Sequence, residues 1–98
     1  MCLLPVNLTI PQLYGQDGMK DEAIVYAKLF TPDSNWTWYV TEYDPIDRVC
    51  FGLVVGFVPE LGYFSIDELE EVTGPMGLHI ERDLYFEPQP LKNVRKDW

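Results

Sequence analysis

The sequence predicts an α+β fold, in which an antiparallel β-meander of three to five strands is combined with two or three short helices. Apolar and polar residues alternate with a period of two in consecutive segments, and the connections between these segments are too short for parallel crossovers. A capping box then precedes a short acidic segment with helical spacing. These observations indicate a sheet of sequential strands followed by a helix.

The chain is expected to form one domain, because a single hydrophobic core serves 98 residues. A hydrophobic fraction of 47% supplies enough apolar side chains for that core despite the charge. We expect residues 1–90 to form the single α+β domain and residues 91–98 to form a basic C-terminal tail or a short helix.

The N-terminal region favours a short helix. Asn7 or Thr9 can cap it, and Gly15 would end it. Pro11 suits an early helical position, because its missing N–H would have no partner there. Residues 16–22 are polar and are expected to form a loop.

Three strands are expected next, at residues 23–30, 36–43 and 49–58, with proline-containing turns at 31–35 and 44–47. In the second strand, the alternation is expected to place Trp36, Trp38 and Val40 on one face and Thr37, Tyr39, Thr41 and Tyr43 on the other. In the third strand, it is expected to place Val49, Phe51, Leu53, Val55 and Phe57 on one face and Cys50, Gly52, Val54, Gly56 and Val58 on the other.

Two glycines, Gly52 and Gly56, lie on the same face of the third predicted strand. Glycine inside a strand allows another part of the structure to approach closely, or it marks a bend or bulge. The sequence leaves both interpretations open.

A turn at 59–62 is expected to follow, after which residues 63–64 either return as a short strand or lead into a helix. Ser65 and Glu68 form a capping box for a helix at 66–72, with its apolar side chains on one face. Gly74 and the proline after it would end that helix. Residues 80–87 alternate weakly and could add an edge strand.

The charge is strongly negative and unevenly distributed. The formal net charge is −9, and the residues before position 88 carry fifteen acidic and four basic side chains, a net charge of −11. Such a field repels nucleic acid and anionic lipid and accelerates encounters with basic protein surfaces. The alternative is that the charge only maintains solubility.

The cysteines and the hydropathy favour a cytoplasmic location. Cys2 and Cys50 lie far apart in unlike settings, which argues against a disulfide framework. The N-terminus lacks the basic region of a signal peptide, and no segment approaches the length of a membrane-spanning helix.

Few residues suggest catalysis or metal binding. His79 is the only histidine, which excludes a two-histidine metal site, and Cys50 lies in an apolar strand where a thiol is usually inert. The pairs Asp44 with Asp47 and Glu81 with Asp83 could hold a hard cation, but the first pair is better explained as a turn. We therefore expect a non-enzymatic protein without a cofactor or a bound metal.

A partner-binding site is expected to combine acidic and aromatic side chains. Acids spaced over a sheet and a helix can imitate the phosphates of a nucleic acid, or they can simply form a solvated face. Two tryptophans on one strand face can form a platform, although core packing suits at least one of them. The candidate residues are Glu42, Asp44, Asp47, Asp67, Glu68, Glu70, Glu71, Trp36 and Trp38.

Five segments carry a resemblance to a known family: AIVYAKLF at 23–30, NWTWY at 35–39, DRVCFG at 47–52, ELGYFS at 60–65 and IERDLYFEP at 80–88. Over residues 10–90 the chain resembles the bacterial domain-of-unknown-function family 2958. The resemblance implies a small cytoplasmic protein of plasmids, integrative elements and phages. That context suggests a role against host defence, and it brings no catalytic residues with it.

The expected function is that of a non-enzymatic acidic inhibitor carried by a mobile element, which binds a nucleic-acid-processing defence enzyme. Anti-restriction or anti-CRISPR activity fits this description, with DNA mimicry as one mode. The expected partner is a protein with a basic surface, not nucleic acid or a membrane, and self-association is left open. Two alternatives are a structural or regulatory protein-interaction module with incidental acidity and a small metal-dependent hydrolase.

Overall fold

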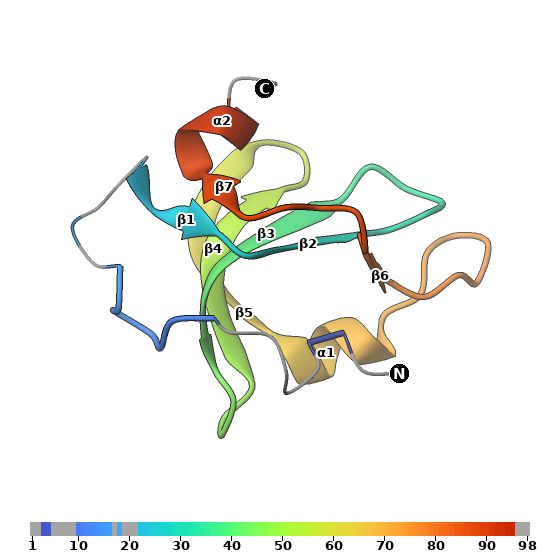
Figure 1. Ribbon diagram of the computed structural model, residues 1–98. Coiled ribbons are helices and arrows are strands. Elements are labelled where there is room, and N and C mark those ends of the chain that lie inside the picture. Colours follow the sequence, from blue (N-terminus) through green and yellow to red (C-terminus); the bar gives the residue numbers. More distant parts are fainter. Residues whose placement is uncertain (1–2, 5–9, 17, 19–21, 96–98) are drawn as a thin grey trace.

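The computed structural model describes residues 3–4, 10–16, 18 and 22–95. In these ranges, most of the regular structure is antiparallel sheet, accompanied by two short helices, which confirms the α+β class (Figure 1). The elements are β1 (Ile24–Val25), β2 (Ala27–Phe30), β3 (Thr37–Asp44), β4 (Val49–Val55), β5 (Pro59–Ser65), α1 (Ile66–Glu71), β6 (Glu81–Arg82), β7 (Gln89–Pro90) and α2 (Leu91–Arg95). None of the helices in the described ranges has the length and apolar character needed to span a membrane.

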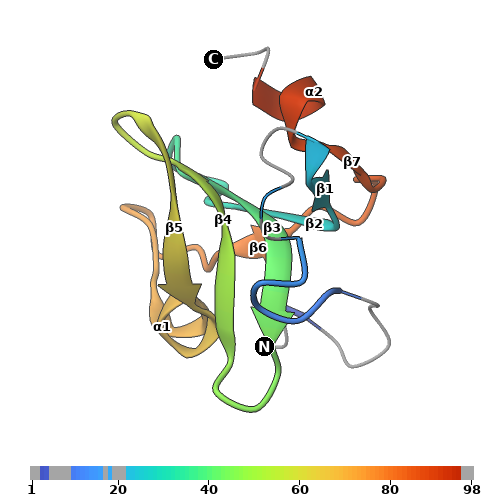
Figure 2. The ribbon, with the colours of Figure 1, turned by 90° about the vertical axis from the view of Figure 1, so that its left-hand side faces the viewer.

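The main sheet has five strands in the order β5-β4-β3-β2-β6, and each neighbouring pair is antiparallel. Strands β2 to β5 are neighbours in both sequence and space, which confirms the meander expected from the short connections. Strands β1 and β7 pair in a separate two-stranded sheet. Figure 2 shows β5 along one outer edge of the main sheet.

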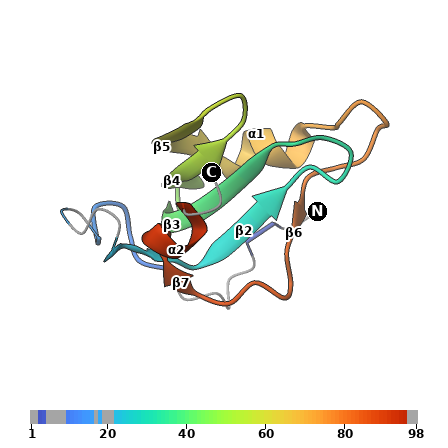
Figure 3. The same ribbon diagram turned by 90° about the horizontal axis from the view of Figure 1, so that it is seen from above.

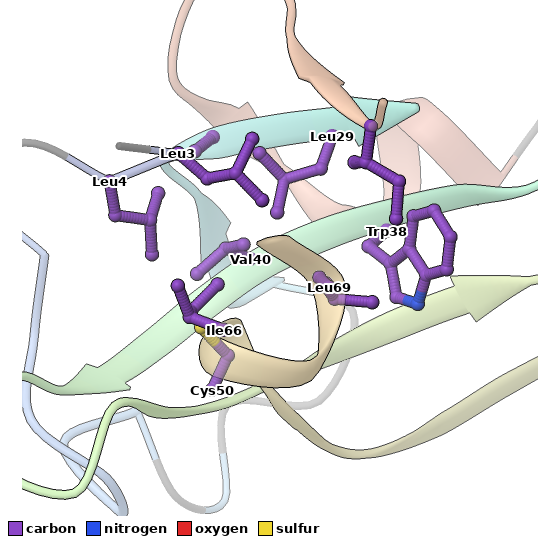
Figure 4. Packing of buried hydrophobic residues seen from close by; sticks show 10 residues of the cluster. Leu3, Leu4, Leu29, Trp38, Val40, Cys50, Ile66 and Leu69 are labelled. Atoms are coloured by element: carbon purple, nitrogen blue, oxygen red, sulfur yellow. The ribbon is translucent and has the colours of Figure 1, made fainter. Parts of the chain in front are cut away.

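One face of the main sheet packs against α1 and residues 3–4 (Figure 4). Ile66 and Leu69 lie three positions apart, so one side of α1 carries both into this core. Each fully buried aliphatic side chain contributes roughly 1.5–3 kcal/mol. The buried residues of this first cluster are Leu3, Leu4, Ala27, Leu29, Trp38, Val40, Cys50, Ile66, Leu69 and Ile80.

The opposite face packs against α2, which lies over the sheet in Figure 3. Leu91 and Val94, one helical turn apart, are both buried there. Residues 91–94 therefore contribute to the packed domain. The buried residues of this second cluster are Val25, Tyr39, Leu53, Val55, Leu91 and Val94.

The N-terminal helix expected from Asn7 and Thr9 is absent from the described part of its range. Both residues lie outside the described ranges, and residues 10–16 are irregular with a turn. A hydrogen bond of 2.9 Å from the N–H of Gly15 to the carbonyl of Gln12 closes this turn. The N–H groups at positions 14 and 16 bind a carboxylate of the sheet rather than helical carbonyls.

The turn expected at 59–62 lies instead at 56–58, so that β4 ends at Val55 and β5 includes the whole expected turn. A Cβ atom at Gly56 would overlap the indole ring of Trp36, which confirms close approach as the role of this glycine. Pro59 is compatible with the first position of an edge strand, because its missing N–H removes no ladder hydrogen bond there.

A bulge interrupts β3 between Val40 and Glu42. The extra residue reverses the alternation, so Tyr43 packs against the first cluster instead of sharing a face with Tyr39 as the period of two predicted. The same reversal turns Glu42 toward the face that α2 covers. The side chains after the bulge are therefore assigned to the wrong faces by simple alternation.

Gly52 lies across from this bulge and pairs with Val40. A Cβ atom at Gly52 would overlap the carbonyl oxygen of Tyr39 and would lie 3.3 Å from the backbone nitrogen of Thr41. The bulge is thus the reason for glycine at this position.

The helix α1 begins at the predicted capping box. Ser65 is its N-cap, and the Ser65 hydroxyl accepts a hydrogen bond of 3.3 Å from the N–H of Glu68. Val72 is the C-cap, so the helix ends slightly before the expected 72. The edge strand expected at 80–87 is reduced to the two residues of β6.

Cys50 is fully buried in the first cluster, as its apolar surroundings in the sequence predicted. Burial raises the pKa of the Cys50 thiol far above its ordinary value, and the charge of Arg48 opposes this shift. We expect Cys50 in a Cys2→Ser chain to resist a thiol-specific disulfide reagent until denaturant is added, since only the thiolate reacts. Modification of the native chain at the rate of free cysteine would contradict this burial.

Candidate functional site

Trp36 lies where the loop between β2 and β3 returns to the sheet. The N–H of Trp36 donates to the Thr31 hydroxyl (3.2 Å), and the N–H of Thr31 donates to the Trp36 carbonyl (3.1 Å), so Thr31 closes the loop. The Trp36 ring stacks on Trp38, with centroids 6.0 Å apart and 25° between the planes. The Phe57 ring also contacts Trp36, edge-on, with centroids 5.7 Å apart and 78° between the planes.

The two predicted tryptophans have different roles. Trp38 is 8% exposed and belongs to the first cluster, whereas Trp36 is only partly buried. Phe57 next to Trp36 is 95% exposed, and its neighbour Val58 is 57% exposed. Core packing therefore accounts for Trp38, and Trp36 with the β4–β5 turn forms the accessible aromatic part.

The segment between α1 and β6 lies beside the β2–β3 loop because Asp33 holds it there. The Asp33 carboxylate accepts a hydrogen bond of 2.8 Å from the N–H of Met76. A Cβ atom at Gly74 would overlap this carboxylate, so glycine permits the approach. Within the segment, the N–H of Gly74 donates to the Leu78 carbonyl (2.8 Å).

A cavity of about 360 Å³ lies between these two loops. Trp36 and Trp38 line it from the sheet, Thr31 and Ser34 from the β2–β3 loop, and residues 72–75 from the segment after α1. Val72, which lines this cavity, is 43% exposed, and Met76, directly after Pro75, is 79% exposed. We call Trp36, Phe57, Val58, Val72 and Met76 the aromatic surface.

The predicted acids do not form one continuous face. The Asp44 carboxylate accepts from the N–H of Ile46 (2.9 Å) and of Asp47 (3.3 Å), which confirms the turn interpretation. Arg48 pairs with Asp67 at 3.2 Å and with Glu70 at 2.7 Å. Asp47, Glu68 and Glu71 are exposed and have no ion pair among the described residues.

Glu42 is not a surface acid. It is 6% exposed, and its carboxylate accepts hydrogen bonds of 2.8 Å from the N–H groups of Tyr14 and Gln16. The Gln16 side-chain amide bonds in turn to the backbone of Ile24 and Thr41. This network ties the N-terminal segment to the sheet, so Glu42 has a structural role.

A second cavity, of about 200 Å³, lies beside this network. Glu42 and Phe51 line it from the sheet, Tyr14 from the N-terminal segment, and Leu61 and Tyr63 from β5. Phe51 and Tyr63 meet edge-on at 4.9 Å. The cavity is smaller than the roughly 300–1,000 Å³ of typical ligand pockets. No sequence pattern indicated it, because its walls come from distant segments.

The residues considered for metal chemistry lie apart. Within the described ranges, no three side chains of His, Cys, Asp or Glu gather closely enough to hold a metal ion. His79 is exposed, and its backbone forms an isolated bridge with Thr73. The Asp83 carboxylate lies 3.9 Å from the Nζ atom of Lys28 and accepts a hydrogen bond from the N–H of Tyr85.

Comparison with known proteins gives one family match. The family model described as "Protein of unknown function (DUF2958)" matches residues 9–94. No curated protein and no solved structure matches the chain.

Proposed function

The chain belongs to the DUF2958 family of proteins of unknown function, and from this premise we propose that it is a non-enzymatic protein-binding domain. Its aromatic surface anchors a partner, and its acidic side chains select a partner with a basic surface. The observation that carries this proposal is the group of exposed apolar side chains around Trp36.

The exposure of the aromatic surface is unusual for side chains of this type. Phe57 contacts the ring of Trp36 and is 95% exposed, and Met76, directly after Pro75 of the cavity wall, is 79% exposed. Contiguous exposed apolar patches commonly mark interaction sites, and aromatic residues dominate binding energy at such sites. The hydrogen bond between Asp33 and the Met76 N–H fixes one border of the surface, and Gly56 lets the β4–β5 turn pack closely on Trp36 at the other. Surfaces that are fixed before binding lose less entropy on binding.

The charge supports a basic partner. The net charge is −9, and α1, which carries the exposed Glu68 and Glu71, ends next to Val72 of the aromatic surface. Complementary charge mainly raises the association rate and the specificity. We propose a nucleic-acid-processing defence enzyme as the partner, because such enzymes carry basic surfaces and the family resemblance suggests mobile elements.

DNA mimicry by all seven candidate acids receives less support than anchoring by the aromatic surface. Glu42 is buried, and Asp67 and Glu70 are paired with Arg48. The acids that stay available are too few for a phosphate array. A regulatory interaction module that uses the same aromatic surface is the second candidate function, and its binding would resist salt.

The proposal is tested by capturing the partner from the native host with the tagged chain and then measuring the affinity of the purified pair. We expect Phe57→Ser with Met76→Ser to weaken binding by about tenfold or more. Leu84→Ser with Tyr85→Ser is the matched control, because these side chains are 73% and 94% exposed outside the aromatic surface. Equal affinity of both double variants would contradict the proposal.

The charge component is tested on the same pair. Glu68→Lys with Glu71→Lys should weaken binding and reduce its salt dependence. Glu87→Lys, at another exposed position, should have a smaller effect. Binding that is insensitive to salt and to charge reversal would favour the regulatory module, and inhibition of the captured enzyme's activity would support the inhibitor.

A further inference from the structure

Strand β5 offers a long, open sheet edge. It contains seven residues and pairs with β4 along its whole length, and within the described ranges no strand pairs with its other side (Figure 2). An edge strand presents a row of backbone N–H and C=O groups to which another extended segment can bind.

The direction of these groups follows from the register. The N–H of Ile66 donates to the Arg48 carbonyl (2.8 Å), one residue beyond the last ladder pair. In an antiparallel ladder, hydrogen-bonded and non-hydrogen-bonded pairs alternate. The N–H and C=O groups of Glu60 and Gly62 therefore bond to β4, whereas the N–H and C=O of Leu61 point away from β4, toward the open edge.

The two edges of the main sheet are protected differently. At β6, the edge strand has only two residues, and both Glu81 and Arg82 are charged. Short and charged edge strands resist pairing with other chains. Strand β5 is longer and carries one charged residue, Glu60. Pro59 blocks pairing only at the start of β5, so the rest of this edge lacks the protection that the opposite edge has.

The two sides of β5 differ in chemistry. Leu61 and Tyr63 point to the α2 side and are 47% and 55% exposed. Glu60 points to the other side, where α1 packs. The Glu70 carboxylate accepts hydrogen bonds from the N–H of Leu3 and the side chain of Arg48. Glu68 lies on the opposite flank of α1, because residues two positions apart in a helix are about 200° apart. An added strand would thus meet apolar side chains on one side and carboxylates on the other.

We propose that the outer edge of β5 pairs with an extended segment of the partner in which Lys or Arg alternates with apolar residues. The apolar side chains contact Leu61 and Tyr63, and the basic ones contact Glu60 and Glu68. Charge complementarity selects this occupant over a second copy of the chain, whose net charge is also −9. The inference rests on the proposed function and specifies how the partner is held.

The experiment uses a synthetic nonapeptide of alternating valine and lysine, with binding to the full chain followed by NMR and fluorescence anisotropy. We expect perturbation of the amide signals of residues 59–65 and saturable binding. A peptide of the same composition with all its lysines at one end should bind at least about fivefold more weakly, because it cannot place apolar and basic residues on opposite sides. Equal binding of both peptides would overturn the proposal.

Two variants locate the peptide. Leu61→Pro removes the outward N–H and should weaken binding by about tenfold, while the ladder to β4 is retained. Glu60→Lys should also weaken binding, whereas Glu81→Lys on β6 is the matched control and should not. If Leu61→Pro fails to fold, a peptide N-methylated at alternate residues provides the same test, because it lacks the N–H donors that pair with β5.

The outcomes separate this inference from the proposed function. Loss of partner capture in Leu61→Pro, with capture retained in the Phe57 and Met76 variant, would support the β5 edge and reject the aromatic surface. The reverse result would reject the β5 edge alone. A dimer in sedimentation that Leu61→Pro dissociates would identify a second copy as the occupant and overturn the partner segment.

Discussion

Gly52→Ala is expected to lower the free energy of unfolding by about 3 kcal/mol or more. The added methyl group would overlap the Tyr39 carbonyl oxygen, which belongs to the backbone and cannot move away as a flexible side chain could. Relief requires the bulge at Thr41 to rearrange. For a domain of this size, the loss corresponds to a decrease in Tm of about 12 °C or more.

The matched control for this substitution is Gly62→Ala. Gly62 is the direct cross-strand partner of Gly52 on β5, and a Cβ atom there would meet nothing within 4 Å. Alanine should be neutral or slightly stabilising at Gly62, because glycine has the larger conformational entropy in the unfolded chain. Thermal and urea unfolding of both variants measure the difference. Similar stabilities would show that the bulge does not require glycine.

Glu42→Ala is expected to have the second large effect, a loss of about 3–5 kcal/mol. The substitution leaves the N–H groups of Tyr14 and Gln16 without their acceptor, and hydrogen bonds to charged groups contribute roughly 1.5–3 kcal/mol each. Glu42→Gln should cost less, because the amide oxygen can still accept one of the two hydrogen bonds. Hydrogen exchange at positions 14 and 16 should accelerate in both variants.

Glu71→Ala provides the comparison for Glu42→Ala. Glu71 is exposed and has no ion pair among the described residues, so the substitution should change stability by no more than about 0.5 kcal/mol. A large stability loss in Glu71→Ala, or none in Glu42→Ala, would contradict the assignment of Glu42 as a structural acid.

Local patterns predicted the centre of the fold. The alternation of apolar and polar residues around Trp38 and Leu53 correctly predicted β3 and β4. The capping box that begins at Ser65 correctly predicted the start of α1. The bulge at Thr41 was not predictable as such, because its position is fixed by pairing with Gly52 on another strand. Simple alternation consequently placed Tyr43 on the wrong face.

The candidate site was predictable only in part. Two tryptophans on one predicted strand face indicated the stacked pair of Trp36 and Trp38. The alternation predicted Phe57 inside the third strand, but β4 ends at Val55, so Phe57 lies in the turn beside Trp36. The contact of Asp33 with Met76 joins residues 43 positions apart, and no local spacing signals it. The burial of Glu42 depends likewise on donors from a distant segment.

The cover that α2 provides for one face of the sheet also makes that face depend on contacts between segments far apart in the sequence. Residues 91–94 cover the face with Tyr39 and Leu53, and β1 pairs with β7. Contacts of this kind cost loop-closure entropy, which slows their formation during folding. A folding intermediate in which α2 has not docked therefore exposes the apolar side chains of this face and is prone to aggregation.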